Sequence, residues 1–276
     1  MIKLIAIDLD GTLLKDDKTI SPEDKEAVAW ARAQGVRVVL ASGRTLHGMI
    51  RFARALDLDC DGEFFVVSNG AGIYEGGSLK PLFRAFLSPE AIRFMMDTAS
   101  EYREELNLQI YVGDRILVDR YLPSTALYAK LAGTPVTEVE SLEPYAEAEM
   151  LKAVLVSSVP EERMKAIQHS LAPRMPEDLK MFQSAEFLLE CVSTESGKWT
   201  SVQKVANILN IQTDEILCIG DNENDAEMVC RAGVGACPSN ANPAVIEVAD
   251  YVAVRDNNHG GVAEIINRML NRPAAG

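Results

Sequence analysis

The stretch IKLIAIDLDGT at residues 2–12 decides the fold. Its first half, residues 2–7, is a short apolar run, too brief for a helix and continuous enough for a strand buried on both faces. Two carboxylates, Asp8 and Asp10, follow directly where that run ends. In a doubly wound α/β sheet the functional loops lie at the carboxyl ends of the strands. The stretch therefore predicts a central parallel strand with chemistry at its end.

The alternation of strand and helix continues to residue 70. Residues 21–24, Ser-Pro-Glu-Asp, supply an N-cap, a proline for the first turn and two acids, and Gly35 is placed to end that helix. A second strand is expected at residues 36–40, a second helix with its apolar face over 46–56, and a third strand at 64–67. This order predicts a doubly wound, Rossmann-like parallel α/β sheet.

The middle third of the chain has a different pattern. We expect a long helix over 88–105 and then a hairpin, in which strands 108–112 and 116–118 flank Gly113-Asp114-Arg115. Further strands are expected at 152–156, 179–183 and 187–192. The earlier rhythm then returns, with a helix at 198–209, a strand at 216–219, a helix from Asn224, a strand at 234–236 and a helix from Val262. We predict an α/β core of residues 1–84 and 190–276, interrupted by an inserted α+β domain at 85–189.

The charge of the chain limits its partners. Acidic side chains outnumber basic ones by 41 to 27, which gives a formal net charge of −14. The mean field of such a chain repels nucleic acid and anionic lipid, so we expect neither as a partner. Basic side chains, backbone amides or a bound cation can override that field inside one cleft, so the net charge does not exclude a small phosphorylated ligand.

Cysteine usage indicates a reducing compartment. The five cysteines are odd in number, form no C-x-x-C pair and are too sparse for a disulfide scaffold. The N-terminal apolar run reaches Asp8 too soon for a signal peptide, and no run approaches the roughly 18 apolar residues of a membrane helix. We therefore expect a cytoplasmic protein.

Two acidic segments suggest a metal site. Asp8 and Asp10 would repel each other unless a cation or a shared proton holds them, which indicates a hard metal such as Mg²⁺. A second segment, GDNEND at 220–225, also follows an apolar strand. If the two strands are neighbours, Asp221 can face Asp8 and complete an oxygen-rich Mg²⁺ site. The alternatives are an Asp-Gly turn in the first segment and simple helix capping in the second.

Two weaker signals concern an anion. Ser42-Gly43-Arg44 follows the second strand at a helix start, where a hydroxyl and exposed amides form an anion site. Capping alone also explains that turn. Lys198 by itself does not indicate a functional site, because a single lysine is ordinarily a solvated surface charge.

Together these segments resemble the motif set of the haloacid dehalogenase superfamily, and the resemblance spans nearly the whole chain. Asp8-x-Asp10-Gly11-Thr12, Ser42, Lys198 and Gly220-Asp221-x-x-Asn224-Asp225 are similar to its four motifs in order. Ser68-Asn69-Gly70-Ala71, Asn240-Ala241 and the insertion resemble the Cof-type members with a large α+β cap, many of them sugar phosphatases. The resemblance also implies a flap over residues 11–20.

The resemblance implies a role for each matching residue. Asp8 would be the nucleophile that forms an aspartyl-phosphate, and Asp10 the general acid and base. Mg²⁺ would be held by the Asp8 carboxylate, the Asp10 main-chain carbonyl and Asp221, with Asp225 acting through water or from behind these ligands. The implied phosphate-binding residues are Ser42, Gly43, Lys198 and Asn224. Candidate contacts to the leaving group are Arg44, Asn69 and polar residues near Gly113-Asp114-Arg115.

Two positions depart from the family pattern. Trp199 stands where a glycine commonly follows the motif lysine, and Asn258-His259 stands where relatives tend to have an acidic pair. We expect Trp199 to alter packing behind Lys198 without abolishing activity, and His259 to have a surface or capping role.

The expected function is a Mg²⁺-dependent phosphatase of small phosphorylated metabolites, with sugar phosphates as the first candidates. One alternative is a phosphomutase of the same superfamily, in which a sugar hydroxyl receives the phosphoryl group. The other is a phospho-acceptor signalling or binding module, which the chain length and Asp10 oppose. The oligomeric state cannot be read from the sequence.

Overall fold

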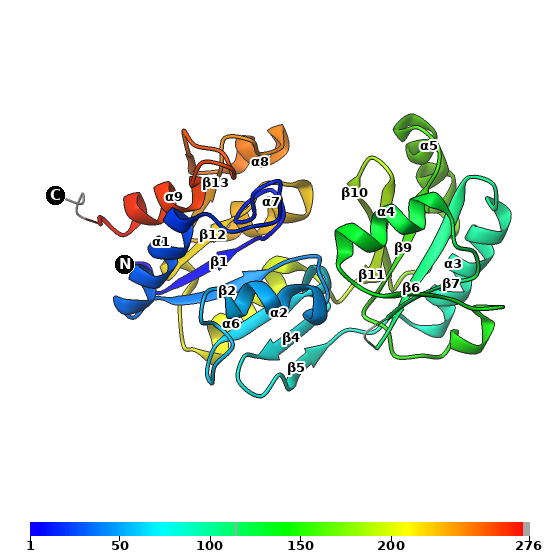
Figure 1. Ribbon diagram of the computed structural model, residues 1–276, viewed down its shortest axis with the longest axis horizontal. Helices are drawn as coiled ribbons and strands as arrows, with labels where there is room; N and C mark the ends of the chain where they lie inside the picture. The colour runs from blue at the N-terminus through cyan, green and yellow to red at the C-terminus, as the bar shows by residue number, and fades with distance from the viewer. Residues whose placement is uncertain (114, 273–276) are drawn as a thin grey trace. The chain divides into compact units, whose positions relative to one another are not determined.

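Two sheets organise the chain, one in each of the two units into which it divides (Figure 1). The computed structural model describes residues 1–113 and 115–272. The core unit consists of Met1–Phe83 together with the chain from Gly197 onward, and the inserted unit is Arg84–Ser196.

The core sheet has eight strands in the order β14-β13-β12-β1-β2-β3-β4-β5. Its central strands are parallel, with β1 hydrogen-bonded to β12 on one side and to β2 on the other. β4 turns back antiparallel to β3, an addition that the sequence prediction lacked. The strand bounds are Leu4–Ile7 (β1), Arg37–Ala41 (β2), Phe64–Val67 (β3), Gly72–Glu75 (β4), Pro81–Arg84 (β5), Ile216–Ile219 (β12), Val234–Cys237 (β13) and Tyr251–Val252 (β14).

Helices cover both faces of the core sheet (Figure 1). One face packs α6, α7 and α8 in a single hydrophobic cluster with alternate residues of the strands, such as Leu4 and Ala6. The intervening residues Ile5 and Ile7 are also fully buried and point to the other face, where α1, α2 and α9 lie. The helices are Pro22–Ala33 (α1), Leu46–Arg54 (α2), Lys198–Ile208 (α6), Glu223–Arg231 (α7), Pro243–Val248 (α8) and Gly261–Met269 (α9). The predicted doubly wound α/β core is confirmed.

The inserted unit is built on a six-stranded sheet in the order β10-β11-β9-β6-β7-β8. Its pairs are antiparallel apart from the parallel pair of β7 and β8. The predicted hairpin is formed by β6 and β7, and Asp114 of its turn lies outside the described residues. The strands are Leu106–Val112 (β6), Arg115–Val118 (β7), Val136–Glu138 (β8), Lys152–Ser157 (β9), Leu179–Ala185 (β10) and Leu188–Ser193 (β11).

Three helices pack on this second sheet. α3 (Pro89–Glu101) and α5 (Glu161–Leu171) share one hydrophobic cluster with the sheet, and α4 (Pro123–Ala132) contributes Tyr128 to a cluster on the opposite face. The helix predicted over residues 88–105 is shorter in the structure. It ends at Glu101 because β6 begins at Leu106, where the backbone must leave the helix to pair with β9.

Two further features bear on the sequence predictions. All five cysteines are unpaired. Among the described residues, no helix has both the length and the apolar character needed to cross a membrane.

Candidate active site

The carboxyl ends of neighbouring parallel strands bring the motifs together at one edge of the core sheet. Ile7 of β1 pairs in register with Ile219 of β12, so the segments that follow these strands leave the sheet side by side. Asp8 follows β1 directly, Asp221 follows β12 after one glycine, and Ser42 follows β2. The first strand and the strand at 216–219 are therefore neighbours, which is the condition under which Asp221 was expected to face Asp8.

Three carboxylates form the centre of this edge. One oxygen each from Asp8, Asp221 and Asp225 lies within 4.8 Å of the others. Asp225 reaches the group from the first turn of α7, where its carboxylate accepts hydrogen bonds from the backbone N–H groups of Asp221 and Asn222 at 3.3 and 3.2 Å. Such an oxygen donor set suits a hard divalent cation.

Lys198 supplies the positive charge of the cluster. Its Nζ lies 2.6 Å from Asp8 Oδ1 and 2.7 Å from Asp225 Oδ1. The side chains of Lys198, Asp8 and Asp225 are only 2%, 6% and 1% exposed. The lysine is the first residue of α6, so the helix start fixes its position, and it is a buried ion-pair partner rather than a solvated surface charge.

The pKa values show a shortage of positive charge. Burial raises the pKa of Asp8 well above its usual range, although Lys198 opposes the shift. Burial and the charge of Asp225 raise the pKa of Asp221 to about 7. The Thr12 hydroxyl, which donates a hydrogen bond to Asp221 at 2.6 Å, lowers this pKa but does not outweigh them. Burial works against the charged form of Lys198, but Asp225 and Asp8 outweigh it and raise the lysine pKa. One ammonium group does not balance three carboxylates, so the residues present fit a bound divalent cation.

Asp10 has separate partners. Arg44 Nε and Nη2 donate to its two carboxylate oxygens at 2.6 and 2.8 Å, and Lys18 Nζ donates to it at 2.9 Å. Burial alone would raise the pKa of Asp10, but the hydrogen bonds and charges of Arg44 and Lys18 outweigh it and hold that pKa below its ordinary value. The Asp10 side chain is 39% exposed, so this carboxylate lies at the solvent side of the site.

Next to the carboxylates lies a group of hydrogen-bond donors with unused capacity. Asn69 donates its backbone N–H to the Ser42 carbonyl at 3.0 Å, and its Oδ1 accepts from Asn224 Nδ2 at 2.9 Å. Its own Nδ2 is buried without a partner, as are Ser68 Oγ and Arg44 Nη1. Buried donors are ordinarily satisfied, so these three indicate a place for an anion or ordered water.

The structure brings the sequence candidates of the core unit into one neighbourhood and adds others. The contacts of Lys18 and Thr12 with Asp10 and Asp221 were not predicted, nor was the unpartnered hydroxyl of Ser68, because no periodic pattern places these side chains. Trp199 is 2% exposed and belongs to the hydrophobic cluster under α6. The His259 side chain is 75% exposed, and its Nδ1 lies 2.6 Å from Asp256 Oδ1.

Comparisons with known proteins agree with this geometry. The model of the haloacid dehalogenase-like hydrolase family matches residues 5–266. The chain is 29% identical to YxeH of Bacillus subtilis, over 98% of this chain and 99% of that protein. It is 28% identical to the 5-amino-6-(5-phospho-D-ribitylamino)uracil phosphatase YcsE of the same organism, over 98% of this chain and 96% of that protein. A crystal structure of a haloacid dehalogenase-like hydrolase from Bacteroides thetaiotaomicron superposes with a TM-score of 0.87 at 28% identity, covering 98% and 100% of the two chains.

Proposed function

The chain belongs to the haloacid dehalogenase-like hydrolase family, and on that premise we propose that it is a Mg²⁺-dependent phosphatase of small phosphorylated metabolites. The observation that carries the proposal is the buried cluster in which Lys198 bridges Asp8 and Asp225 beside Asp221. A carboxylate held at a sheet edge next to a lysine and a cation site is equipped to attack phosphorus.

In the proposed reaction Asp8 is the nucleophile and Asp10 is the general acid and base. An Asp8 carboxylate oxygen attacks phosphorus, the bond from phosphorus to the ester oxygen breaks, and Asp10 gives its proton to the departing oxygen. Asp10 then takes a proton from water, and the resulting hydroxide attacks the phosphorus of the aspartyl-phosphate. Phosphate leaves and the Asp8 carboxylate is restored. Asp10 suits the proton transfers because it lies at the solvent side, within reach of water and a leaving group.

Asp8 and Asp221, with the Asp10 main-chain carbonyl, would hold Mg²⁺, and Asp225 would support them from α7. Bound there, the cation would neutralise charge on the carboxylates and on the phosphoryl oxygens. Lys198, Ser42, Gly43 and Asn224 would hold the phosphoryl group. The unpaired donors of Ser68, Asn69 and Arg44 support the presence of an anion site on this side.

We further propose polyhydroxylated phosphate esters, with sugar phosphates first, as the substrate class. YcsE, 28% identical to this chain, is named for a substrate in which the phosphate sits on a ribityl chain. The inserted domain, predicted at residues 85–189, would select the leaving group. The unpaired cysteines support the proposal that the protein works in a reducing compartment such as the cytoplasm.

Phosphate release from a panel of sugar phosphates, sugar-alcohol phosphates, nucleotides and phosphorylated cofactors tests the proposal. Each substrate is assayed with MgCl₂ or with EDTA, and Asp8→Asn serves as the blank. We expect release that requires both Mg²⁺ and Asp8. Conversion of one hexose phosphate isomer into another without free phosphate would identify a phosphomutase instead. A phosphorylated Asp8 that persists without turnover would identify a phospho-acceptor module.

A further inference from the structure

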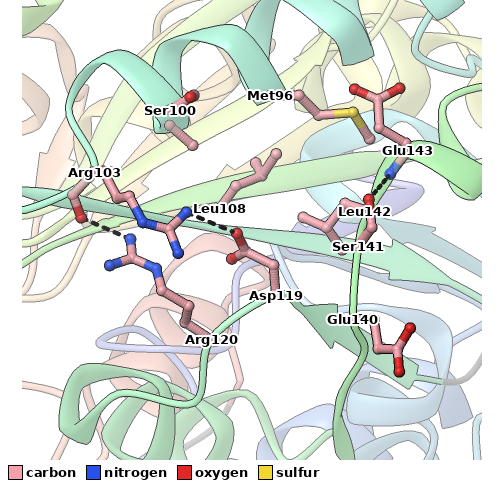
Figure 2. Close-up of a pocket in the computed structure, with 11 residues that line it drawn as sticks. Met96, Ser100, Arg103, Leu108, Asp119, Arg120, Glu140, Ser141, Leu142 and Glu143 are labelled. Atoms are coloured by element: carbon pink, nitrogen blue, oxygen red, sulfur yellow. Dashed lines mark hydrogen bonds and ion pairs between the residues drawn. The ribbon is translucent and has the colours of Figure 1, made fainter.

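The inserted unit contains a cavity of about 180 Å³ on the sheet face that packs α3 (Figure 2). It opens between the last turns of α3 and the segment 140–143. Met96, Leu108 and Leu142 give it apolar walls. Each described lining residue belongs to the inserted unit, and none of them belongs to the carboxylate cluster.

One side of the cavity carries two arginines and an aspartate (Figure 2). Arg103 Nη1 lies 3.6 Å from Asp119 Oδ2, an ion pair that is too long for a direct hydrogen bond. The Arg103 side chain is 55% exposed, so this pair can open toward a ligand without loss of a buried contact.

Arg120 is held in place by the backbone. Its Nη2 donates to the carbonyl oxygens of Arg103 and Leu106 at 2.6 and 3.2 Å. Its Nε is buried and has no hydrogen-bond partner. Among the residues that the structure describes, no carboxylate forms an ion pair with Arg120. A fixed guanidinium with an unused buried donor and no acidic partner is suited to bind a carboxylate.

The remaining charges of the cavity favour a ligand that carries both a positive and a negative charge. Glu140 and Glu143 lie across the cavity from the arginines in Figure 2, so a simple anion would meet their repulsion. A simple cation would meet Arg103 and Arg120 and would leave Arg120 without a counterion. A molecule with adjacent carboxylate and ammonium groups adds no net charge and satisfies both signs.

We propose that this cavity binds a free α-amino acid with an apolar side chain. The ligand carboxylate is bound by Arg120 and Arg103, and its ammonium group by the Asp119 carboxylate. The side chain lies along Leu108 and Met96. A cavity of about 180 Å³ suits a ligand of this size and is too small for a nucleotide or a large cofactor.

Isothermal titration calorimetry of the full chain tests the site with l-valine, l-leucine, l-methionine and l-phenylalanine. We expect at least one to bind with a dissociation constant of about 0.1–1 mM, as befits so few ligand atoms. For l-leucine, two analogues isolate the charges: 4-methyl-2-oxopentanoate lacks the ammonium group and 3-methylbutylamine lacks the carboxylate. We expect both to bind at least about tenfold more weakly than the amino acid.

Three variants locate the binding. Arg120→Gln should weaken amino-acid binding by about tenfold or more. Asp119→Asn should bring the amino acid and its oxo acid to similar affinities. Arg93→Gln is the matched control, because Arg93 lies on α3 in an exposed ion pair with Glu147 and does not line the cavity. Arg103→Gln provides a second carboxylate test if loss of the Arg120 backbone contacts prevents folding.

Failure of all four amino acids to bind would overturn the proposal. Equal binding of either single-charge analogue, or equal losses in Arg93→Gln and Arg120→Gln, would overturn it as well. The readout is binding rather than phosphate release, so its outcome is separate from that of the proposed phosphatase activity.

Discussion

Replacing Lys198 with methionine tests the buried ion-pair cluster most directly. The substitution keeps an unbranched side chain of similar length and removes the ammonium group. It breaks the 2.6 Å contact to Asp8 and the 2.7 Å contact to Asp225 at once. Loss of one partner from a buried ion pair costs about 3–5 kcal/mol, because the other charge stays desolvated.

That cost should depend on pH. Without the lysine, Asp8 and Asp221, whose pKa values burial already raises, can relieve the repulsion among the carboxylates by taking up a proton. We therefore expect the full loss of about 3–5 kcal/mol above neutral pH, and a smaller loss as the pH falls and protonation becomes easier. The rate of phosphate release should fall at least roughly thirtyfold, which corresponds to a loss of about 2 kcal/mol of transition-state stabilisation.

Urea denaturation in EDTA buffer, followed by tryptophan fluorescence, measures the stability. Both tryptophans, Trp30 on α1 and Trp199 on α6, lie in the core unit and report its unfolding. Lys25→Met, at an exposed position of α1, is the control and should change the free energy of unfolding by less than about 0.5 kcal/mol. A loss in Lys198→Met below about 1 kcal/mol, or one that does not vary with pH, would refute the reasoning.

Three further predictions concern the same site. Because the pKa of Asp221 is raised from 3.8 to about 7 in the folded chain, stability in EDTA should fall as the pH rises through that interval. Asp221→Asn should flatten that slope in urea titrations, and an unchanged slope contradicts the assignment. Arg44→Gln removes the two charged hydrogen bonds that hold the Asp10 carboxylate in position, and should lower kcat/KM for phosphate release about tenfold or more; wild-type values would show that Arg44 does not position Asp10. Gly70→Ala should cost about 2 kcal/mol more than Gly35→Ala in thermal or urea unfolding: both glycines have positive φ, of 89° and 82°, but only at Gly70 would a Cβ collide with the backbone of Gly197. Equal losses would show that this close approach is unimportant.

The carboxylate cluster was predictable because its residues follow buried strands. The segments 4–7 and 216–219 are short and apolar; Asp8 follows the first directly, and Asp221 follows the second after one glycine. Parallel strands place such ends along one edge, so Asp8 and Asp221 were expected to meet if their strands are neighbours. The pairing of β1 with β12 realises that expectation.

The residues that sequence reasoning missed depend on local backbone shape. Lys18 has a φ of 62° and reaches Asp10 from the segment between β1 and α1. Ser68, with a φ of 51°, presents its hydroxyl from a left-handed turn that it shares with the predicted Asn69. No hydrophobic period or spacing encodes such a turn. Helix α4 was missed for a related reason, since it starts after Leu122, which lacks the usual polar N-cap side chain.

The two catalytic candidates, two residues apart, have pKa values displaced in opposite directions, and both are opposite to what catalysis needs. A nucleophile must be ionised, yet burial raises the pKa of Asp8. A general acid must carry a proton, yet Arg44 and Lys18 lower the pKa of Asp10 against the effect of burial.

The charges that a reaction mixture adds would correct both displacements. A divalent cation between Asp8 and Asp221 would favour the ionised nucleophile. A phosphate ester would attract the guanidinium of Arg44 and the ammonium of Lys18, and its negative charge would favour a protonated Asp10. The cation would thus correct the charge state of Asp8, and the substrate that of Asp10. Phosphate release should consequently require the cation even at saturating substrate, because each ligand would correct the charge state of a different carboxylate.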